Sequence, residues 1–273
     1  SPVCVSSASA GLVVSLKALG IGVGDEVIIP RQTFIATGLA VLEVGAQPVF
    51  CDIDITTGSL DLISAERLIS SKTRALIFVH WGGNGHNSNA FIELSHKYNI
   101  GLIEDAAHAF GGNVNTKEKI GKIKFENHFV VFSFQAIKFF TTGDGGCICA
   151  HSKYYQDLKS LSWFGIDKSR SKGRRKFNEE KGLNISLNGY KFNMNAIQAS
   201  IGLANLRNID QRICMRRERA EKYFHAIKKS KKIKSLIKNK EQIKLGIFWF
   251  FPLLCENRIE VIKLLNYNNV PNS

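Results

Sequence analysis

The sequence feature that most constrains the fold is the alternation of short apolar runs with helix-like segments up to Ala150. The runs 74–80 (RALIFVH) and 128–134 (HFVVFSF) are as long as buried strands, and 89–99 (NAFIELSHKYN) has apolar residues at helical spacing. Short apolar strands separated by helices predict an α/β fold with a mostly parallel sheet and helices on both faces. In such a sheet, ligands bind beyond the carboxyl ends of the strands.

The same patterns predict the remaining elements of this region. Strands are expected at 25–30, 47–54, 74–80, 100–106, 128–134 and 146–151. Helices are expected at 7–19, 34–45, 59–69, 89–99 and 153–165. Ser59 or Asp61 is the expected N-terminal cap of the third helix, since both side chains can accept a hydrogen bond from the first turn.

The pattern changes after Ala150. The segment 194–229 reads as one long helix or a broken pair, and a strand-like run at 247–254 and a helix at 257–269 follow it. One strand and one helix cannot form an independent core, so this last part is truncated or leans on the first. We therefore expect a large α/β domain at 1–192, a linking helix at 193–230 and an incomplete small C-terminal α/β domain at 231–273.

The chain is basic, with a net charge of +14, so nucleic-acid binding has to be considered. Much of the charge lies at 168–176, 216–219 and 228–240, and none of these runs is interleaved with aromatic residues as a stacking surface would be. We interpret them as solvated helix faces and loops and expect no nucleic-acid partner, although anionic partners such as nucleoside diphosphates remain compatible. No apolar run reaches the roughly 18 residues of a membrane span, so no membrane partner is expected.

The six cysteines form no CxxC pair. Cys147 and Cys149 would point to the same face of a strand, where we interpret them as small buried apolar residues in a reducing, cytoplasmic compartment. The spacing of His80 and His86 does not support a metal site, and none is expected. We expect the segment 80–86 (HWGGNGH) to form a loop at the rim of the site, where His80 or Trp81 faces the substrate.

Two residues at predicted strand ends suggest covalent chemistry. Asp105 ends a buried strand, and Lys138 follows another strand in the segment FSFQAIKFFTTGDGG. Both side chains could reach the same edge of the sheet. A partly desolvated lysine has a lowered pKa and becomes a nucleophilic amine, while a buried carboxylate needs a cationic partner. Taken singly, a surface lysine and a turn-capping aspartate are the more ordinary interpretations.

Together, the lysine and the carboxylate match the needs of pyridoxal phosphate (PLP). This cofactor requires a Schiff-base lysine and a carboxylate partner for its pyridinium nitrogen. Its phosphate needs an anion site, which the segment 6–11 (SSASAG) supplies through hydroxyls and free N–H groups at the start of a helix. Ser133 adds another hydroxyl shortly before Lys138.

Ordered motifs make the chain resemble the DegT/StrS sugar aminotransferases, PLP enzymes of the aspartate aminotransferase fold. The matches extend from about Val3 to Asn208 and run in order through SSASAG, ALGIGVGDEVIIP, QTFIATGLAVLEVGAQPVFCDID, IEDAAHAFGG, FSFQAIKFFTTGDGG and GYKFNMNAIQASIG. The resemblance implies the fold type I of PLP transferases, with a seven-stranded, mostly parallel sheet.

The resemblance also implies roles for individual residues. Lys138 would form the Schiff base and move the proton, and Asp105 would pair with the pyridine nitrogen. His108 would contact the side of the ring that carries the hydroxyl, and Phe34 would stack on the ring. Phosphate contacts would come from Ser9, Ala10 and Ser133, and from Asn193 of a neighbouring subunit, which implies a homodimer with shared active sites.

The implied reaction is transfer of an amino group from glutamate to a nucleotide-linked keto-deoxysugar, giving an amino sugar for a surface polysaccharide. Related dehydratases replace the lysine with histidine, so Lys138 favours transamination. The competing hypothesis is a non-catalytic or regulatory protein of the same fold, inactivated by truncation, because the family has further residues before SSASAG and a fuller C-terminal domain. Two more hypotheses are a different PLP reaction on this scaffold and a basic protein that binds nucleic acid.

Overall fold

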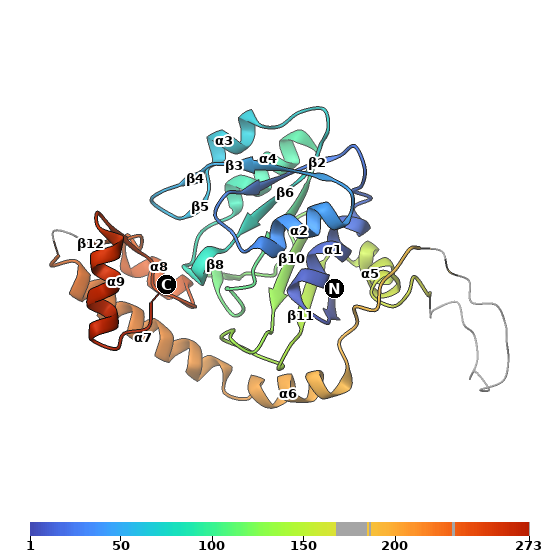
Figure 1. The fold of residues 1–273 in the computed structure, drawn as a ribbon. Helices are drawn as coiled ribbons and strands as arrows, with labels where there is room; N and C mark the ends of the chain where they lie inside the picture. Colours follow the sequence, from blue (N-terminus) through green and yellow to red (C-terminus); the bar gives the residue numbers. More distant parts are fainter. Residues whose placement is uncertain (168–184, 186, 231–232, 273) are drawn as a thin grey trace.

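A computed structural model of the chain describes residues 1–167, 185, 187–230 and 233–272, so the basic run at 168–176 lies outside the described residues. A seven-stranded sheet forms its centre, in the order β1-β11-β10-β7-β6-β2-β3 (Figure 1). Its strands are β1 (Pro2–Val5), β2 (Glu26–Pro30), β3 (Gln47–Cys51), β6 (Thr73–Val79), β7 (Gly101–Asp105), β10 (His128–Ser133) and β11 (Gly146–Ala150).

The five strands from β3 to β10 are parallel, and β11 and β1 are antiparallel to their neighbours. The middle strands are buried on both faces, as the continuous apolar runs predicted: every residue of β7 and β10 is buried. The predicted α/β class with a mostly parallel, seven-stranded sheet is therefore confirmed.

Helices cover both faces of the sheet. On one face, α1 (Ala8–Ala18), α2 (Ile35–Glu43) and α5 (Tyr155–Leu161) pack on residues such as Ile77 and Val131. On the other face, α3 (Leu62–Arg67) and α4 (Asn89–Tyr98) pack on residues such as Leu76 and Phe78. Asp61, one of the two predicted caps of α3, accepts a hydrogen bond from the Ser64 N–H, whereas Ser59 lies in a short strand.

Short elements fill the loops of the large unit. They are the paired strands β4 (Ile53–Asp54) and β5 (Ser59–Leu60), the paired strands β8 (Asn113–Asn115) and β9 (Glu118–Lys119), and the 3-10 helices η1 (Trp81–Gly83) and η2 (Ser152–Tyr154). Among the described residues, no helix is both long and apolar enough to cross a membrane.

The segment predicted as one long helix or a broken pair is a pair, α6 (Ala196–Leu206) and α7 (Ile209–Ile227). These helices run from the large unit to a small C-terminal unit (orange to red in Figure 1). The small unit consists of β12 (Ile233–Ser235), α8 (Lys240–Leu245), β13 (Leu253–Cys255) and α9 (Arg258–Tyr267). The domain boundaries 1–192, 193–230 and 231–273 stay a proposal.

The prediction of a strand over 247–254 was wrong for most of this run. Only its end belongs to β13, and the preceding residues form an irregular segment. The N–H groups of Ile247 and Phe248 donate to the Gly83 carbonyl, and the Trp249 N–H donates to the Gly82 carbonyl. The small unit therefore leans on the large one through this segment.

Candidate active site

Loops beyond the carboxyl ends of the parallel strands surround a cavity of about 670 Å³. Six of the eight predicted site residues line this cavity: Ser9, Phe34, Asp105, His108, Ser133 and Lys138. Asp105 and Ser133 are the last residues of the neighbouring strands β7 and β10, which explains why residues far apart in sequence meet here. The cavity lies where a parallel α/β sheet ordinarily holds its ligand.

Asp105 is a buried carboxylate with few partners. Its Oδ1 accepts a hydrogen bond from the Ala107 N–H at 3.1 Å, and its Oδ2 accepts one from the Thr37 hydroxyl at 2.9 Å. Burial raises the pKa of Asp105, while these hydrogen bonds and the positive charge of Lys138 oppose that rise. A cationic or N–H ligand group would stabilise the ionised carboxylate further.

Lys138 is half-buried in the turn after β10, where its backbone N–H donates to the Gln135 carbonyl at 2.9 Å. Its Nζ lies 4.2 Å from the centroid of the Trp249 ring. Burial lowers the pKa of the Lys138 amine, and the negative charge of Asp105 acts in the opposite direction. A lysine of lowered pKa has more unprotonated amine at neutral pH, which is the form that attacks carbonyl carbon.

The glycines after Lys138 allow this turn to pack closely. Gly143 and Gly145 have φ of 84° and 155°, which side chains disfavour. At Gly146, a Cβ atom would lie 2.7 Å from the Ser7 carbonyl carbon and 2.8 Å from the Ala8 nitrogen. Only glycine at this position lets β11 approach the start of α1 so closely.

His108 and Trp249 form a stacked pair in the cavity wall. Their ring centroids are 4.1 Å apart at an interplanar angle of 19°, and His108 Nδ1 accepts a hydrogen bond from the Gly82 N–H at 3.2 Å. Burial, with a further contribution from the Lys138 charge, lowers the pKa of His108 to about 3. The imidazole is therefore neutral at physiological pH.

The first turn of α1 borders the cavity with Ser7, Ala8 and Ser9. The Ser7 side chain caps the helix by accepting a hydrogen bond from the Ala10 N–H at 3.1 Å, and the turn contains no acidic residue. The exposed Ser9 lines the cavity, whereas Ala10 is buried and does not. Because the Ala10 N–H already has a partner, its predicted phosphate contact depends on a change in that hydrogen bond.

Asn193 lies apart from these residues. Its backbone bridges Val5, its Oδ1 accepts a hydrogen bond from Lys191 Nζ at 2.7 Å, and its Nδ2 donates to the Met194 carbonyl at 3.1 Å. It borders a different cavity, beside α5. Its predicted contact with the cofactor of a neighbouring subunit stays a prediction.

The sequence interpretation missed several residues that shape the site. Thr37 is fully buried and holds Asp105, and Trp249 and Phe250 reach the cavity from the segment of the small unit that was predicted to be a strand. Thr37 could have been found from its place three residues after Phe34, because residues at this spacing lie on the same side of a helix. Trp249 has no comparable signal, since its contacts depend on how the two units dock.

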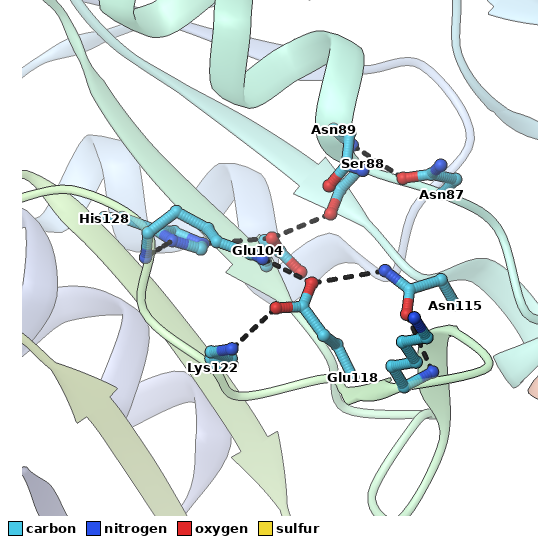
Figure 2. A network of polar contacts seen from close by, with 10 residues as sticks. Asn87, Ser88, Asn89, Glu104, Asn115, Glu118, Lys122 and His128 are labelled. Carbon is cyan, nitrogen blue, oxygen red and sulfur yellow. Dashed lines mark hydrogen bonds and ion pairs between the residues drawn. The ribbon is translucent and has the colours of Figure 1, made fainter.

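Of the two rim-loop residues that were candidates for facing the substrate, only one lines the cavity. Trp81 lines the cavity, but His80 is buried behind it, with its Nε2 2.5 Å from Glu104 Oε2. Figure 2 shows Ser88 and His128 pointing toward the same carboxylate. Burial raises the pKa of Glu104, but hydrogen bonds from His128 and His80 more than offset this and hold the pKa below its ordinary value.

Comparisons with known proteins place this chain in a family. The sequence profile of the DegT/DnrJ/EryC1/StrS aminotransferase family matches residues 2–273. The spore coat polysaccharide biosynthesis protein SpsC of Bacillus subtilis is 35% identical over 222 residues, which are 81% of this chain and 56% of that protein. The chain thus spans little more than half the length of this relative.

Solved structures agree with the profile. The sugar aminotransferase CalS13 of Micromonospora echinospora superposes with a TM-score of 0.87 at 26% identity, over 98% of this chain and 72% of that one. Spr1654 of Streptococcus pneumoniae, solved in a PLP form, gives a TM-score of 0.82 at 26% identity, over 98% and 71%. With the profile covering nearly all of it, the chain belongs to the DegT/DnrJ/EryC1/StrS aminotransferase family.

Proposed function

We propose that the chain carries the active site of a PLP-dependent aminotransferase that moves an amino group from glutamate to a nucleotide-linked keto-deoxysugar. The observation that carries the proposal is one cavity lined by both the Lys138 amine, whose pKa is lowered by burial, and the buried Asp105 carboxylate. The names of SpsC and CalS13 support amino-sugar synthesis for polysaccharide as the biological purpose.

The residues present fit three of the polar groups of PLP: the phosphate, the ring nitrogen and the aldehyde. The first turn of α1, capped by Ser7 and free of acidic residues, is suited to a phosphate. Asp105 is a buried carboxylate suited to a protonated ring nitrogen, and Lys138 is an amine suited to the aldehyde carbon. When bound, the cofactor supplies an electron sink for the carbanion formed at the α-carbon of the amino donor.

Each side chain then has a defined task. Asp105, fixed by Thr37 and Ala107, keeps a proton on the ring nitrogen. Lys138 holds the cofactor between turnovers and afterwards carries the proton from the donor's α-carbon. Trp249 covers the lysine and, with the exposed Phe34, limits the access of water to the ring. Because Nδ1 of neutral His108 accepts the Gly82 hydrogen bond, its Nε2 carries the proton and can donate a hydrogen bond without adding charge.

A homodimer is the assembly that we propose. Large apolar side chains of α2 are exposed, among them Ile35, Leu39 and Leu42, and an apolar row of this kind favours a protein partner. Asn193 lies away from the cavity of its own chain, so its predicted phosphate contact needs a second copy. All six cysteines are free thiols, which supports the proposed cytoplasmic location.

The test uses the purified chain with PLP and glutamate. We expect a visible absorption band of covalently held cofactor, lost in Lys138→Ala and kept in Lys117→Ala, a change at an exposed lysine of the β8–β9 turn. A panel of nucleotide keto-sugars is then screened for release of 2-oxoglutarate. Cofactor binding without release for any sugar would favour a non-catalytic protein of this fold, and salt-sensitive nucleic-acid binding independent of Lys138 would favour a nucleic-acid-binding protein.

A further inference from the structure

Three of the six cysteines lie together at the edge of the central sheet, away from the proposed active site. Cys4 of β1 is the direct cross-strand partner of Cys147 of β11, and Cys149 lies two residues further along β11. Alternation along a strand places all three side chains on the same face. The sequence interpretation treated Cys147 and Cys149 as small buried apolar residues and did not anticipate Cys4 beside them.

The geometry of Cys4 and Cys147 suits a covalent link. Directly opposed residues of antiparallel strands have Cα atoms about 4.5–5.5 Å apart, which lies within the range that disulfides span. The Cys147 thiol interacts with both Cys4 and Cys149. Cys147 and Cys149 are less suited to a disulfide, because same-face neighbours on one strand are separated by roughly 6.7 Å of strand rise.

We propose that Cys4 and Cys147 form a reversible disulfide, with Cys4 as the thiol that reacts first with a low-molecular-weight disulfide. Cys4 is exposed at the sheet edge, whereas Cys147 is buried among the apolar residues that cover this face. An oxidant from solvent therefore meets Cys4 first. The hydrogen bond from Cys147 lowers the pKa of Cys4 to about 7, although burial opposes this, which increases its thiolate fraction.

The reaction proceeds in two exchange steps. The Cys4 thiolate attacks one sulfur of the small disulfide, whose S–S bond breaks to release one thiolate and leave a mixed disulfide on Cys4. The Cys147 thiol then loses its proton and attacks Cys4 Sγ, which releases the second thiolate. Two protein thiols are oxidised, one small disulfide is reduced to two thiols, and the proton lost from Cys147 is taken up by a released thiolate.

The link would fix an edge strand beside the start of α1. β1 is one of the two edge strands of the sheet, and it leads directly to Ser7, the cap of α1. On the neighbouring strand, Gly146 precedes Cys147, and a Cβ atom at this position would meet the backbone of Ser7 and Ala8. Oxidation therefore fastens the segment that places the first turn of α1, and reduction releases it.

The experiment incubates the full chain with graded ratios of oxidised to reduced glutathione and then blocks free thiols. Mass spectrometry of non-reduced peptides is expected to find a Cys4–Cys147 link that dithiothreitol removes. The link is expected to be lost in Cys4→Ser and kept in Cys149→Ser and in Cys214→Ser, a change at an exposed thiol of α7. Circular dichroism checks that each variant keeps its fold.

A second measurement needs no variant. Oxidation of the unaltered chain is expected to raise its melting temperature by roughly 5 °C, because the link closes a long loop of the unfolded chain. The proposal is overturned if all thiols stay free, if glutathione remains on Cys4 without exchange, or if Cys214→Ser abolishes the link. An unchanged melting temperature after the link has formed would overturn the proposal that the link fixes β1 in place.

Discussion

At the scale of single residues, burial decides what Asp105 and Lys138 can do. The same two residue types at the surface would be an ordinary pair of opposite charges, worth at most about 1 kcal/mol. Inside the cavity, burial shifts the pKa of each residue in the direction that favours its neutral form. The charge of each residue opposes the shift of the other. A bound group that holds a proton near Asp105 would therefore strengthen this arrangement.

Asp105→Asn tests this arrangement. The amide keeps the size of the side chain and can still accept the Ala107 hydrogen bond, but it cannot keep a proton on a ring nitrogen. We expect kcat to fall by about two to four orders of magnitude, with a smaller effect on KM. Steady-state kinetics measure the loss, and Asp157→Asn on the exposed face of α5 is the control. Equal losses in the two variants would contradict the assignment.

His108 makes the stability of the chain depend on pH. Its folded pKa of about 3 lies below the ordinary value of 6.5, so the unfolded chain binds this proton more readily. Stability is therefore lost as pH falls through the window from 6.5 to 3. Between pH 6.5 and 4.5, the unaltered chain should lose about 2 kcal/mol more than His108→Gln.

Urea unfolding at several pH values measures this difference. Gln can still accept the Gly82 hydrogen bond, so the comparison isolates the titration of His108 from the loss of that contact. His96→Gln on the exposed face of α4 is the control and should keep the pH dependence of the unaltered chain. If the free energy of unfolding had the same pH dependence in the unaltered chain and in His108→Gln, burial of His108 would not suppress its protonation.

At the scale of elements, the start of α1 depends on β11. A Cβ atom at position 146 would meet backbone atoms of Ser7 and Ala8, which cannot rotate away as a side chain can. We expect Gly146→Ala to cost about 1–3 kcal/mol and to weaken binding of the PLP phosphate at this turn. Thermal unfolding and PLP titration measure the two effects.

Gly38→Ala is the matched control for that change. Its Cβ atom would meet only Ile29 Cδ1, at 3.5 Å, and it lies within α2, where alanine is favoured over glycine. It should leave stability unchanged or raise it by up to about 1 kcal/mol. If both glycine variants behaved alike, close packing of β11 on α1 would not explain Gly146.

The exposed face of α2 gives a test of assembly. Replacing Leu39 with Asp places a charge in the proposed interface, where an exposed apolar side chain now lies. We expect the dimer dissociation constant to rise more than tenfold, and sedimentation velocity over a concentration series measures it. Ile259→Asp on α9 removes another exposed apolar side chain elsewhere and should leave the dimer intact. A monomeric unaltered chain would refute the assembly directly.

The sequence was sufficient to predict most of the central sheet, for a physical reason. Runs such as those of β7 and β10 are buried on both faces, so their apolar character is continuous and visible without a structure. The sequence was insufficient for 247–254, where neighbouring aromatic residues pack in different parts of the molecule. Phe248, with φ of 49°, packs in the small unit, while Trp249 and Phe250 enter the cavity. Contacts of this kind depend on how the small unit packs against the large one, which local periodicity does not encode.

At the scale of the whole molecule, the small unit completes the site of the large one. Backbone hydrogen bonds to Gly82 and Gly83 hold the segment that carries Trp249, and the Trp249 Nε1–H donates to the Ile137 carbonyl at 3.0 Å. A Cβ atom at Gly83 would lie 2.3 Å from the His108 carbonyl oxygen, so this junction tolerates no side chain. The environment of Lys138 therefore depends on residues that lie far along the chain.

Trp249→Ala tests that dependence. Removing the indole exposes Lys138 to water, and because burial is the largest influence on its pKa, that pKa should rise toward the ordinary lysine value. The pH dependence of Lys138 modification by an amine-specific reagent, followed by mass spectrometry, measures the midpoint. Trp249→Phe keeps an aromatic cover and should leave the midpoint nearly unchanged. A midpoint that stays fixed or falls in Trp249→Ala would mean that attraction between the ammonium and the ring outweighs desolvation, and the small unit would then stabilise the charged lysine instead of the nucleophile.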